Sequence, residues 1–160
     1  MTAAINDWPD RGSTPVPAPL GRRVEDYPTT ITEKIRLSDT DRQGHVNNVN
    51  FAFFLEAGRS DLLHERFELR DEGCQYMIAT ATIDFLGELH WPGEVVIGTG
   101  IERVGKSSLS FRQGLFQHGR CVASSTSTVV QVNIASMRAQ PFSEGTRALM
   151  RQAMIDAGDA

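Results

Sequence analysis

The residues best suited to chemistry are concentrated in one polar stretch, residues 38–48, which reads SDTDRQGHVNN. It holds two carboxylates, Asp39 and Asp41, and ends on Asn47 and Asn48, a residue type favoured at the start of a helix. A helix N-terminus has amides without intrahelical partners and carries partial positive charge. A carboxylate there is suited to act as base or nucleophile, and the free amides can stabilise an oxyanion. The alternative is structural, with the aspartates in Asx turns and an asparagine as the helix cap.

Two other patterns that suggest chemistry are not supported by their context. Residues 100–107 fit the G-x-x-x-x-G-K-[ST] pattern of phosphate-binding loops, but that loop must open a helix. Here the flanking residues alternate as strands, so a β-hairpin turn is predicted instead. We expect no metal site, because the spacing of the histidines and cysteines is not that of metal ligands; these residues are His45, His64, His90, His118, Cys74 and Cys121.

Length and charge restrict the classes of protein to consider. The chain has 160 residues, which fits one domain, and a formal net charge of −4. A mildly acidic chain lacks the field of a general nucleic-acid binder, so any polyanion must contact a local basic cluster. No stretch approaches the ~20 apolar residues of a membrane span, and residues 1–10 do not resemble a secretory signal. We therefore expect a cytoplasmic protein with reduced cysteines and with no nucleic-acid or membrane partner.

The elements that must position the polar stretch are predicted from proline content and periodicity. Five of the seven prolines lie in residues 1–28, which are predicted to be an extended or disordered arm, and residues 29–160 to be a single domain. Residues 30–37 are rich in β-branched side chains and predict a strand. Residues 49–66 predict a helix of roughly 18 residues whose front half is apolar almost all round, so we expect that half to be enclosed.

After Gly73 the hydrophobic period changes to two. It predicts four long strands joined mainly by hairpins, with His118-Gly119 as a tight turn, and a short helix after Pro141. One enclosed helix among so many strands predicts an α+β fold, in which an antiparallel sheet wraps around one long central helix. Such a sheet leaves a face or an edge uncovered, and we therefore expect a dimer.

The polar stretch also resembles a known family. The run D-T-D-x-x-G-H-V-N-N at residues 39–48, followed by a Phe- and Leu-rich helix with E-A-G-R at residues 56–59, closely resembles the hotdog-fold acyl-CoA thioesterases of the 4-hydroxybenzoyl-CoA thioesterase type. The resemblance covers roughly residues 30–133, since I-D-F at residues 83–85, G-E-V at 93–95 and G-K-S-S at 105–108 follow in that family's order. It implies a hotdog fold assembled as a homodimer or homotetramer.

The same resemblance implies an acyl-CoA thioesterase that needs no cofactor, coenzyme A being part of the substrate. Asp41 matches the catalytic aspartate, which attacks the thioester or activates water. The amide of Asn48 matches the group that polarises the thioester carbonyl, and Gly44 matches a glycine that lets the loop pass close to the substrate. His45 and Asn47 are predicted to contact the substrate, in a segment that looks more like that of members acting on fatty acyl-CoA.

Three further residues are matched to the family outside the polar stretch. Lys106 and Arg103 match a basic turn that holds the nucleotide phosphates of coenzyme A. They supply the local basic cluster that a chain with a net negative charge needs in order to bind a polyanion. Glu56 matches a helix carboxylate kept by a different hotdog branch. Its alternative is an i,i+3 pair with Arg59.

The sequence leaves two other functions open. One is a hotdog hydratase or dehydratase acting on acyl thioesters, for which His45, four residues after Asp41, completes an Asp/His pair. The other is a protein that binds acyl-CoA without catalysis. The acyl group, the choice between coenzyme A and carrier-protein thioesters, and the choice between nucleophilic and general-base routes are also left open.

Overall fold

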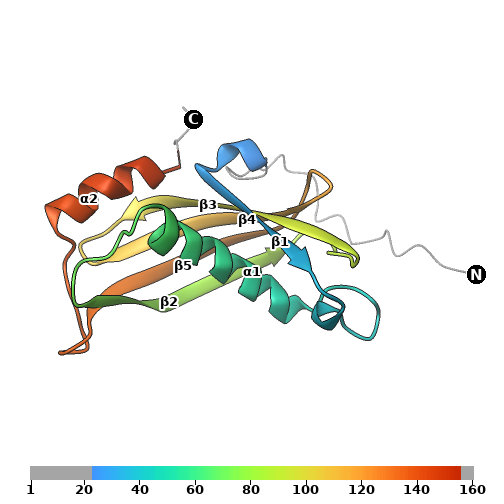
Figure 1. Cartoon of the computed structure of the whole chain (residues 1–160), viewed down its shortest axis with the longest axis horizontal. Helices are drawn as coiled ribbons and strands as arrows, with labels where there is room; N and C mark the ends of the chain where they lie inside the picture. The colour runs from blue at the N-terminus through green and yellow to red at the C-terminus, as the bar shows by residue number, and fades with distance from the viewer. Residues whose placement is uncertain (1–22, 156–160) are drawn as a thin grey trace, which may run out of the picture.

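One curled antiparallel sheet carries a long helix across one face in a computed structural model that describes residues 23–155 (Figure 1). The strands are β1 (Thr29–Ile35), β2 (Cys74–Phe85), β3 (Gly93–Val104), β4 (Ser108–Gln117), β5 (Arg120–Asn133) and β6 (Arg138–Ala139). Their spatial order is β1-β3-β4-β5-β2, and β6 pairs with β5. The predicted α+β hotdog architecture is confirmed.

The predicted helix of residues 49–66 is present in two parts. An α-helix, α1 (Asn48–Ser60), continues directly into a π-helical segment, η3 (Asp61–Arg66). The predicted terminal helix is α2 (Glu144–Met150), and short 3-10 segments are η1 (Val24–Asp26), η2 (Leu37–Asp39) and η4 (Arg151–Ala153). In the described part of the chain, no helix is both long enough and apolar enough to cross a membrane.

Two of the predicted hairpins are confirmed, and one connection differs. Gly105 closes the turn between β3 and β4 by donating its amide to Ser108, so residues 100–107 form the predicted hairpin. His118 and Gly119 join β4 to β5 with φ of 52° and 73°, the positive values of a type I′ turn. The connection from β2 to β3 is not a hairpin, because β1 and β4 occupy both edges of β3 and β2 pairs with β5 instead.

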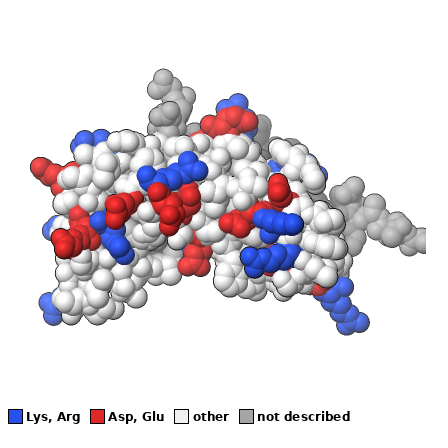
Figure 2. Space-filling view, viewed as in Figure 1, with Lys and Arg blue, Asp and Glu red and all other residues white. Residues whose placement is uncertain are grey.

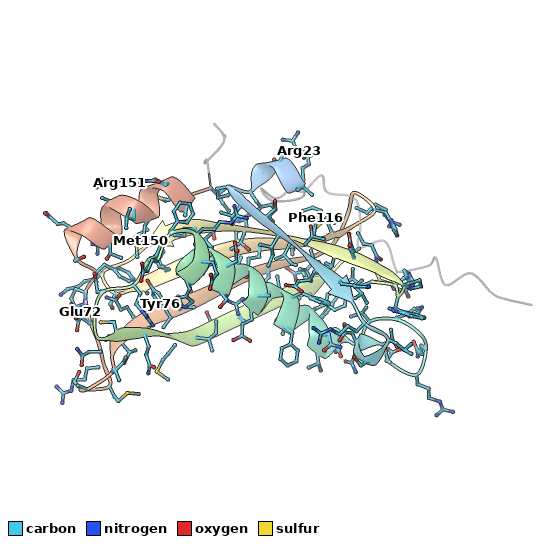
Figure 3. The ribbon with its side chains drawn as sticks, in the orientation of Figure 1. Arg23, Glu72, Tyr76, Phe116, Met150 and Arg151 are labelled. Carbon is cyan, nitrogen blue, oxygen red and sulfur yellow. The ribbon has the colours of Figure 1, made fainter. Side chains whose placement is uncertain are left out.

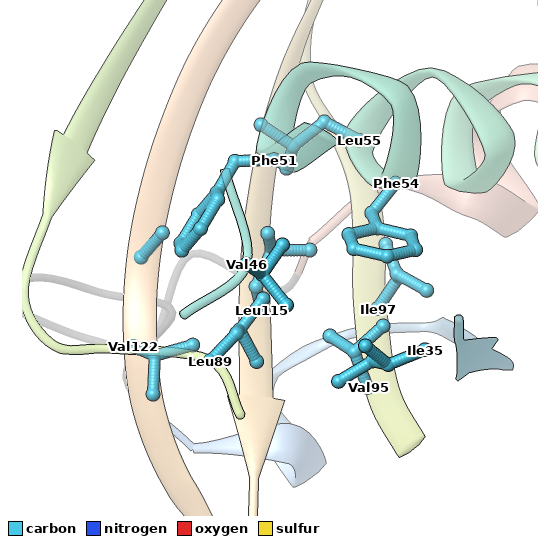
Figure 4. Close-up of a cluster of buried hydrophobic side chains, with 11 residues drawn as sticks. Ile35, Val46, Phe51, Phe54, Leu55, Leu89, Val95, Ile97, Leu115 and Val122 are labelled. Atoms are coloured by element: carbon cyan, nitrogen blue, oxygen red, sulfur yellow. The ribbon is translucent and has the colours of Figure 1, made fainter. Parts of the chain in front are cut away.

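The front of α1 is attached to the sheet by a buried apolar cluster (Figure 4). Phe51, Phe54 and Leu55 pack from the helix against Ile97 and Leu115 of the central strands. Burial of each such side chain stabilises the fold by about 1.5–3 kcal/mol, which fixes the helix start relative to the sheet. A second cluster, which Tyr76 and Met150 mark in Figure 3, lies beneath η3 and α2 at the other end of the sheet.

The prediction that the front of the helix is enclosed on all sides is wrong for the single chain. Val49 and Phe53 are 60% and 63% exposed. The reason is that the sheet covers one side of α1 only, since the helix packs on β1, β3 and β4 while β2 lies at the sheet edge. An apolar helix face therefore remains open.

Residues 1–22 of the predicted N-terminal arm lie outside the described residues. The last part of that predicted arm is packed against the sheet. The ring of Tyr27 is buried edge-on against Phe116 and lies over Gly98, where a side chain would overlap the ring. Packing on the sheet thus begins before Thr29, the predicted start of the domain.

Candidate active site

The polar stretch forms a loop that joins β1 to α1 and folds back on itself. Three successive residue pairs connect its two sides. The Asn47 amide donates to the Asp39 carbonyl at 2.8 Å, and the Asp41 amide donates to the His45 carbonyl at 2.7 Å. Between these two pairs, Thr40 and Val46 form an isolated antiparallel β-bridge. Asp41 is thereby brought back toward the start of the helix.

The Asp41 side chain is exposed and its two oxygens have different surroundings. Oδ1 accepts the amide of Gln43 at 2.7 Å and the amide of His45 at 3.3 Å. Oδ2 has no hydrogen-bond partner among residues 23–155. The Asx-turn alternative therefore describes one oxygen of Asp41, and the second oxygen is available to a substrate or a water.

The amide of Asn48 is the first of α1, and no acceptor binds it within the described residues. The neighbouring amides are used, because Val49 donates to the Asn47 side chain at 3.0 Å and Asn50 donates to the Asn47 carbonyl at 2.9 Å. The structure thus leaves an unpaired N–H at the positive end of the helix. Asn47, predicted to contact the substrate, has its side-chain oxygen engaged as the helix cap.

Gly44 is required by backbone conformation. Its φ is +85°, a region that residues with a side chain rarely adopt, and a Cβ added there would meet no atom within 4 Å. In the single chain the glycine shapes the loop. Its predicted close approach to substrate stays a prediction.

His45 lies beside a second histidine and a carboxylate, which its position in the sequence did not indicate. Its ring packs edge-on against His90 with 5.1 Å between centroids, and its Nε2 lies 3.6 Å from Glu88 Oε2. No sequence signal was available, because the pairing arises from a β-bridge between residues far apart in the chain.

Lys106 and Arg103, predicted to hold the nucleotide phosphates, lie at the opposite end of the sheet from Asp41 within one chain. β1 ends opposite Gly93, whereas the basic turn follows the far end of β3. At ~3.3 Å per residue, this strand separates the two ends by roughly 35 Å. Lys106 is fixed there, because its carbonyl accepts the amide of Phe142 beside α2. One chain alone does not combine these groups in one site.

A groove of about 340 Å³ flanks the start of α1 and was not predicted from the sequence. Apolar side chains of the helix form one wall, and charged side chains of β1 and the following loop form the other. Its lining residues are Glu33, Lys34, Arg36, Asp39, Asn50, Phe53, Phe54 and Ala57. The groove therefore offers an apolar surface beside two cationic and two anionic side chains near the helix start. Figure 2 shows both charges interspersed over this face of the molecule.

Glu56 lies exposed on α1, and the predicted salt bridge with Arg59 is not formed between these two described residues. Arg59 instead donates from Nη1 to Gln113 Oε1 at 2.9 Å, because its guanidinium reaches beneath the helix. Burial lowers the pKa of Arg59, and the nearby Glu56 carboxylate partly offsets this. Glu56 is left free to act on the open face of the helix.

The comparisons with known proteins agree with this fold. The Thioesterase-like superfamily matches residues 35–150, so the chain belongs to that family. A comparison with curated proteins gave no match. Thioester hydrolysis is thus the reaction class that family membership supports.

Solved structures resemble the chain over most of its length. The PA5185 protein from Pseudomonas aeruginosa has 24% identity and a TM-score of 0.77, over 85% of this chain and 98% of that one. A predicted thioesterase from Bacillus stearothermophilus has 29% identity and a TM-score of 0.72, over 81% and 98%. A thioesterase complexed with coenzyme A and Zn, from Thermus thermophilus, has 24% identity and a TM-score of 0.70, over 78% and 98%.

Proposed function

We propose that the protein is an acyl-CoA thioesterase whose reaction takes place where the loop of residues 38–48 meets the start of α1. The observation that carries this proposal is the unpaired amide of Asn48 beside a loop that holds Asp41 with one free carboxylate oxygen. Membership of the Thioesterase-like superfamily supports the reaction class. The similar Thermus thermophilus thioesterase, complexed with coenzyme A, supports this thiol as the leaving group.

In the proposed reaction the thioester oxygen accepts a hydrogen bond from the Asn48 amide. Negative charge develops on that oxygen as the tetrahedral intermediate forms, and the helix N-terminus stabilises it. The Asp41 carboxylate either attacks the carbonyl carbon or removes a proton from the attacking water. The C–S bond then breaks, the thiolate sulfur takes a proton, and water supplies the new oxygen of the acid.

We propose that the working unit is a homodimer formed along β2. This strand has 12 residues at the sheet edge, and Met77 and Ile78 on it are 47% and 55% exposed. An uncovered edge strand with apolar side chains favours pairing with another strand.

The groove and the basic turn suggest how coenzyme A is held. Phe53 and Phe54 provide an apolar wall for the acyl or pantetheine part. Lys34 and Arg36 supply positive charge in the same groove, next to the carboxylates of Glu33 and Asp39. Lys106 lies too far from Asp41 in its own chain, so we assign it to the site of a second copy. The variants Lys34→Ala and Lys106→Ala separate these contributions, because the larger rise in KM identifies the group that contacts the phosphates.

The test uses the first position of the helix. Asn48→Pro removes the amide hydrogen while keeping the helix, since proline is favoured at this position and Asn47 has the extended φ and ψ (−59°, 137°) that must precede it. Asn48→Ala retains the amide and is the matched control. With a panel of acyl-CoA thioesters and free thiol as readout, we expect the proline variant to lose roughly 10²–10³ in kcat and the alanine variant to resemble wild type.

Other outcomes would contradict the proposal. Equal rates for both Asn48 variants would show that the Asn48 amide takes no part in the reaction. Saturable acyl-CoA binding without thiol release would indicate a binding protein, and hydration of an enoyl-CoA would indicate a hydratase. The last is not favoured, because the His45 ring is directed to Glu88 and His90.

A further inference from the structure

We propose that His45, Glu88 and His90 form a binding site for a divalent transition-metal ion, with Zn²⁺ as the reference ion. The three side chains come from two segments that meet at one end of the sheet, and one of these segments is the loop that carries Asp41. One ligand atom from each residue lies within 4.8 Å of the other two. The proposal goes beyond thioester hydrolysis and does not depend on it.

Backbone geometry places the three side chains on one face. His45 and His90 form an antiparallel β-bridge, so they lie directly opposite each other. Glu88 and His90 are two residues apart, and their side chains lie on the same side, with Glu88 Oε2 3.4 Å from His90 Nε2. Leu89, between Glu88 and His90, and Val46, next to His45, are buried in the apolar cluster beneath α1. The core thereby forces the three polar side chains outward together.

Hydrogen bonds hold the two segments in this register. The Val46 amide donates to the Leu89 carbonyl at 2.9 Å. The side chain of Gln117 contacts His90 on both sides, because its Oε1 accepts the His90 amide at 3.0 Å and its Nε2 donates to the His90 carbonyl at 2.9 Å. The backbone that carries the ligands is therefore ordered before any ion binds, which lowers the entropy cost of binding.

The distances and donor types suit a tetrahedral ion. Ligands at 2.0–2.2 Å from Zn²⁺ lie about 3.4 Å apart in tetrahedral geometry. Glu88 Oε2 is 3.6 Å from His45 Nε2 and 3.4 Å from His90 Nε2. The ligand nitrogens of the two rings and the carboxylate oxygen all lie within 4.8 Å of one another, so small side-chain rotations bring them to one ion. Two imidazoles and one carboxylate leave a fourth position for water or another small ligand.

An ion at this site would act on the neighbouring loop. His45 is joined to Asp41 through both its amide and its carbonyl. Fixing the His45 side chain would therefore restrict the segment that orients the Asp41 carboxylate. We infer that metal binding rigidifies the loop of residues 38–48.

The test is a calorimetric titration of the untagged chain with zinc chloride at neutral pH. We expect one Zn²⁺ per chain, and a rise in Kd of at least roughly tenfold in each of His90→Ala and Glu88→Gln, since even the loss of an outer-shell partner costs 10–100-fold. His64→Ala and His118→Ala are matched controls that should keep the wild-type Kd, and Cys121→Ser tests a thiol contribution.

Absence of zinc binding, an unchanged Kd in His90→Ala, or a loss of binding in Cys121→Ser would each overturn the site. Amide hydrogen exchange tests its effect on the loop. Zinc should slow exchange at Asp41 and His45 in the wild type and not in His90→Ala. Unchanged exchange in zinc-loaded wild-type protein would contradict the coupling. None of these measurements uses thioester hydrolysis, so they fail or succeed independently of the proposed function.

Discussion

Asp41 and His45 hold each other in place across the loop before α1. The amide of Asp41 donates to the His45 carbonyl at 2.7 Å, and the amide of His45 donates to Asp41 Oδ1 at 3.3 Å. This reciprocal contact orients an exposed carboxylate without enclosing it. The same contact explains why a structural role and a chemical role for Asp41 are compatible.

Asp41→Asn should abolish most turnover and leave the fold intact. The amide oxygen of asparagine still accepts the Gln43 and His45 amides, but the side chain no longer supplies a base or nucleophile. We expect kcat to fall by roughly 10² or more while the melting temperature stays near that of wild type. Asp39→Asn is the matched control, because the Asp39 side chain accepts the Arg36 amide in the same loop. A larger loss of activity in the control would transfer the catalytic role to Asp39.

Ile78→Lys should convert the proposed dimer to monomer. A lysine on an edge strand opposes pairing with another strand, and Ile78 is 55% exposed on β2. The measurement is sedimentation equilibrium of wild type and variant. Leu149→Lys, at an exposed apolar position on α2, is the control that should keep the wild-type mass. An unchanged mass for Ile78→Lys would show that β2 is not the interface.

Gln113 and Arg59 should be energetically coupled. Gln113 is fully buried, accepts from Arg59, and donates to the Leu55 carbonyl at 2.8 Å and to Thr99 at 2.9 Å. Gln113→Leu leaves the guanidinium without this acceptor, and we expect a loss of about 2–4 kcal/mol in the free energy of unfolding.

Urea denaturation of single and double variants measures that coupling. The double variant Gln113→Leu/Arg59→Leu should lose less than the sum of the single losses, by about 0.5–3 kcal/mol. Arg151→Leu, at an exposed arginine, should change stability by no more than about 0.5 kcal/mol. Strict additivity of the two single losses would mean that the contact contributes nothing.

Protonation of Asp71 should make the fold less stable in acid. Partial burial raises the pKa of Asp71, but hydrogen bonds from Ser143, Thr146 and Gln131 outweigh it and lower the pKa to about 2. In the unfolded chain this carboxyl has a pKa near 3.9. As the pH falls from about 4 to about 2, Asp71 is therefore protonated in the unfolded chain before it is protonated in the folded one. The stabilisation is present above this window and is lost as pH falls through it.

Urea denaturation at a series of pH values tests this dependence. Since solvent screens a partly exposed group, we expect Asp71 to contribute about 1–2 kcal/mol at neutral pH. The stability difference between wild type and Asp71→Asn should shrink toward pH 2. Glu72→Gln, at the exposed neighbouring carboxylate, should follow the wild-type curve. A pH-independent difference for Asp71→Asn would contradict the assigned cause.

The strands and the central helix were predictable because each has a local hydrophobic period. The pairing of the strands was less predictable, because periodicity does not specify a partner. β2 was expected to form a hairpin with β3, but it pairs with β5. The extent to which the chain encloses its own helix was overestimated for a similar reason. An apolar face such as that of Phe53 shows that something covers it, and does not show whether the cover belongs to the same chain.

The loop of the candidate site was predictable because its residues are neighbours in sequence, and the helix start at Asn48 follows from its capping residues. Relationships between distant segments were not. His45 and His90 meet only through a bridge, and Lys106 is matched to the same family's substrate site as Asp41 yet lies across the length of the sheet. Spacing along the chain carries no information about either separation.

The length of β3 has a consequence for how such a protein would work as a pair. When Asp41 and Lys106 serve the same substrate, they must come from different chains, and each reaction centre is then composite. A mixture of Asp41→Asn and Lys106→Ala chains, each impaired alone, would regain activity upon exchange, since one centre of every hybrid combines the two intact residues.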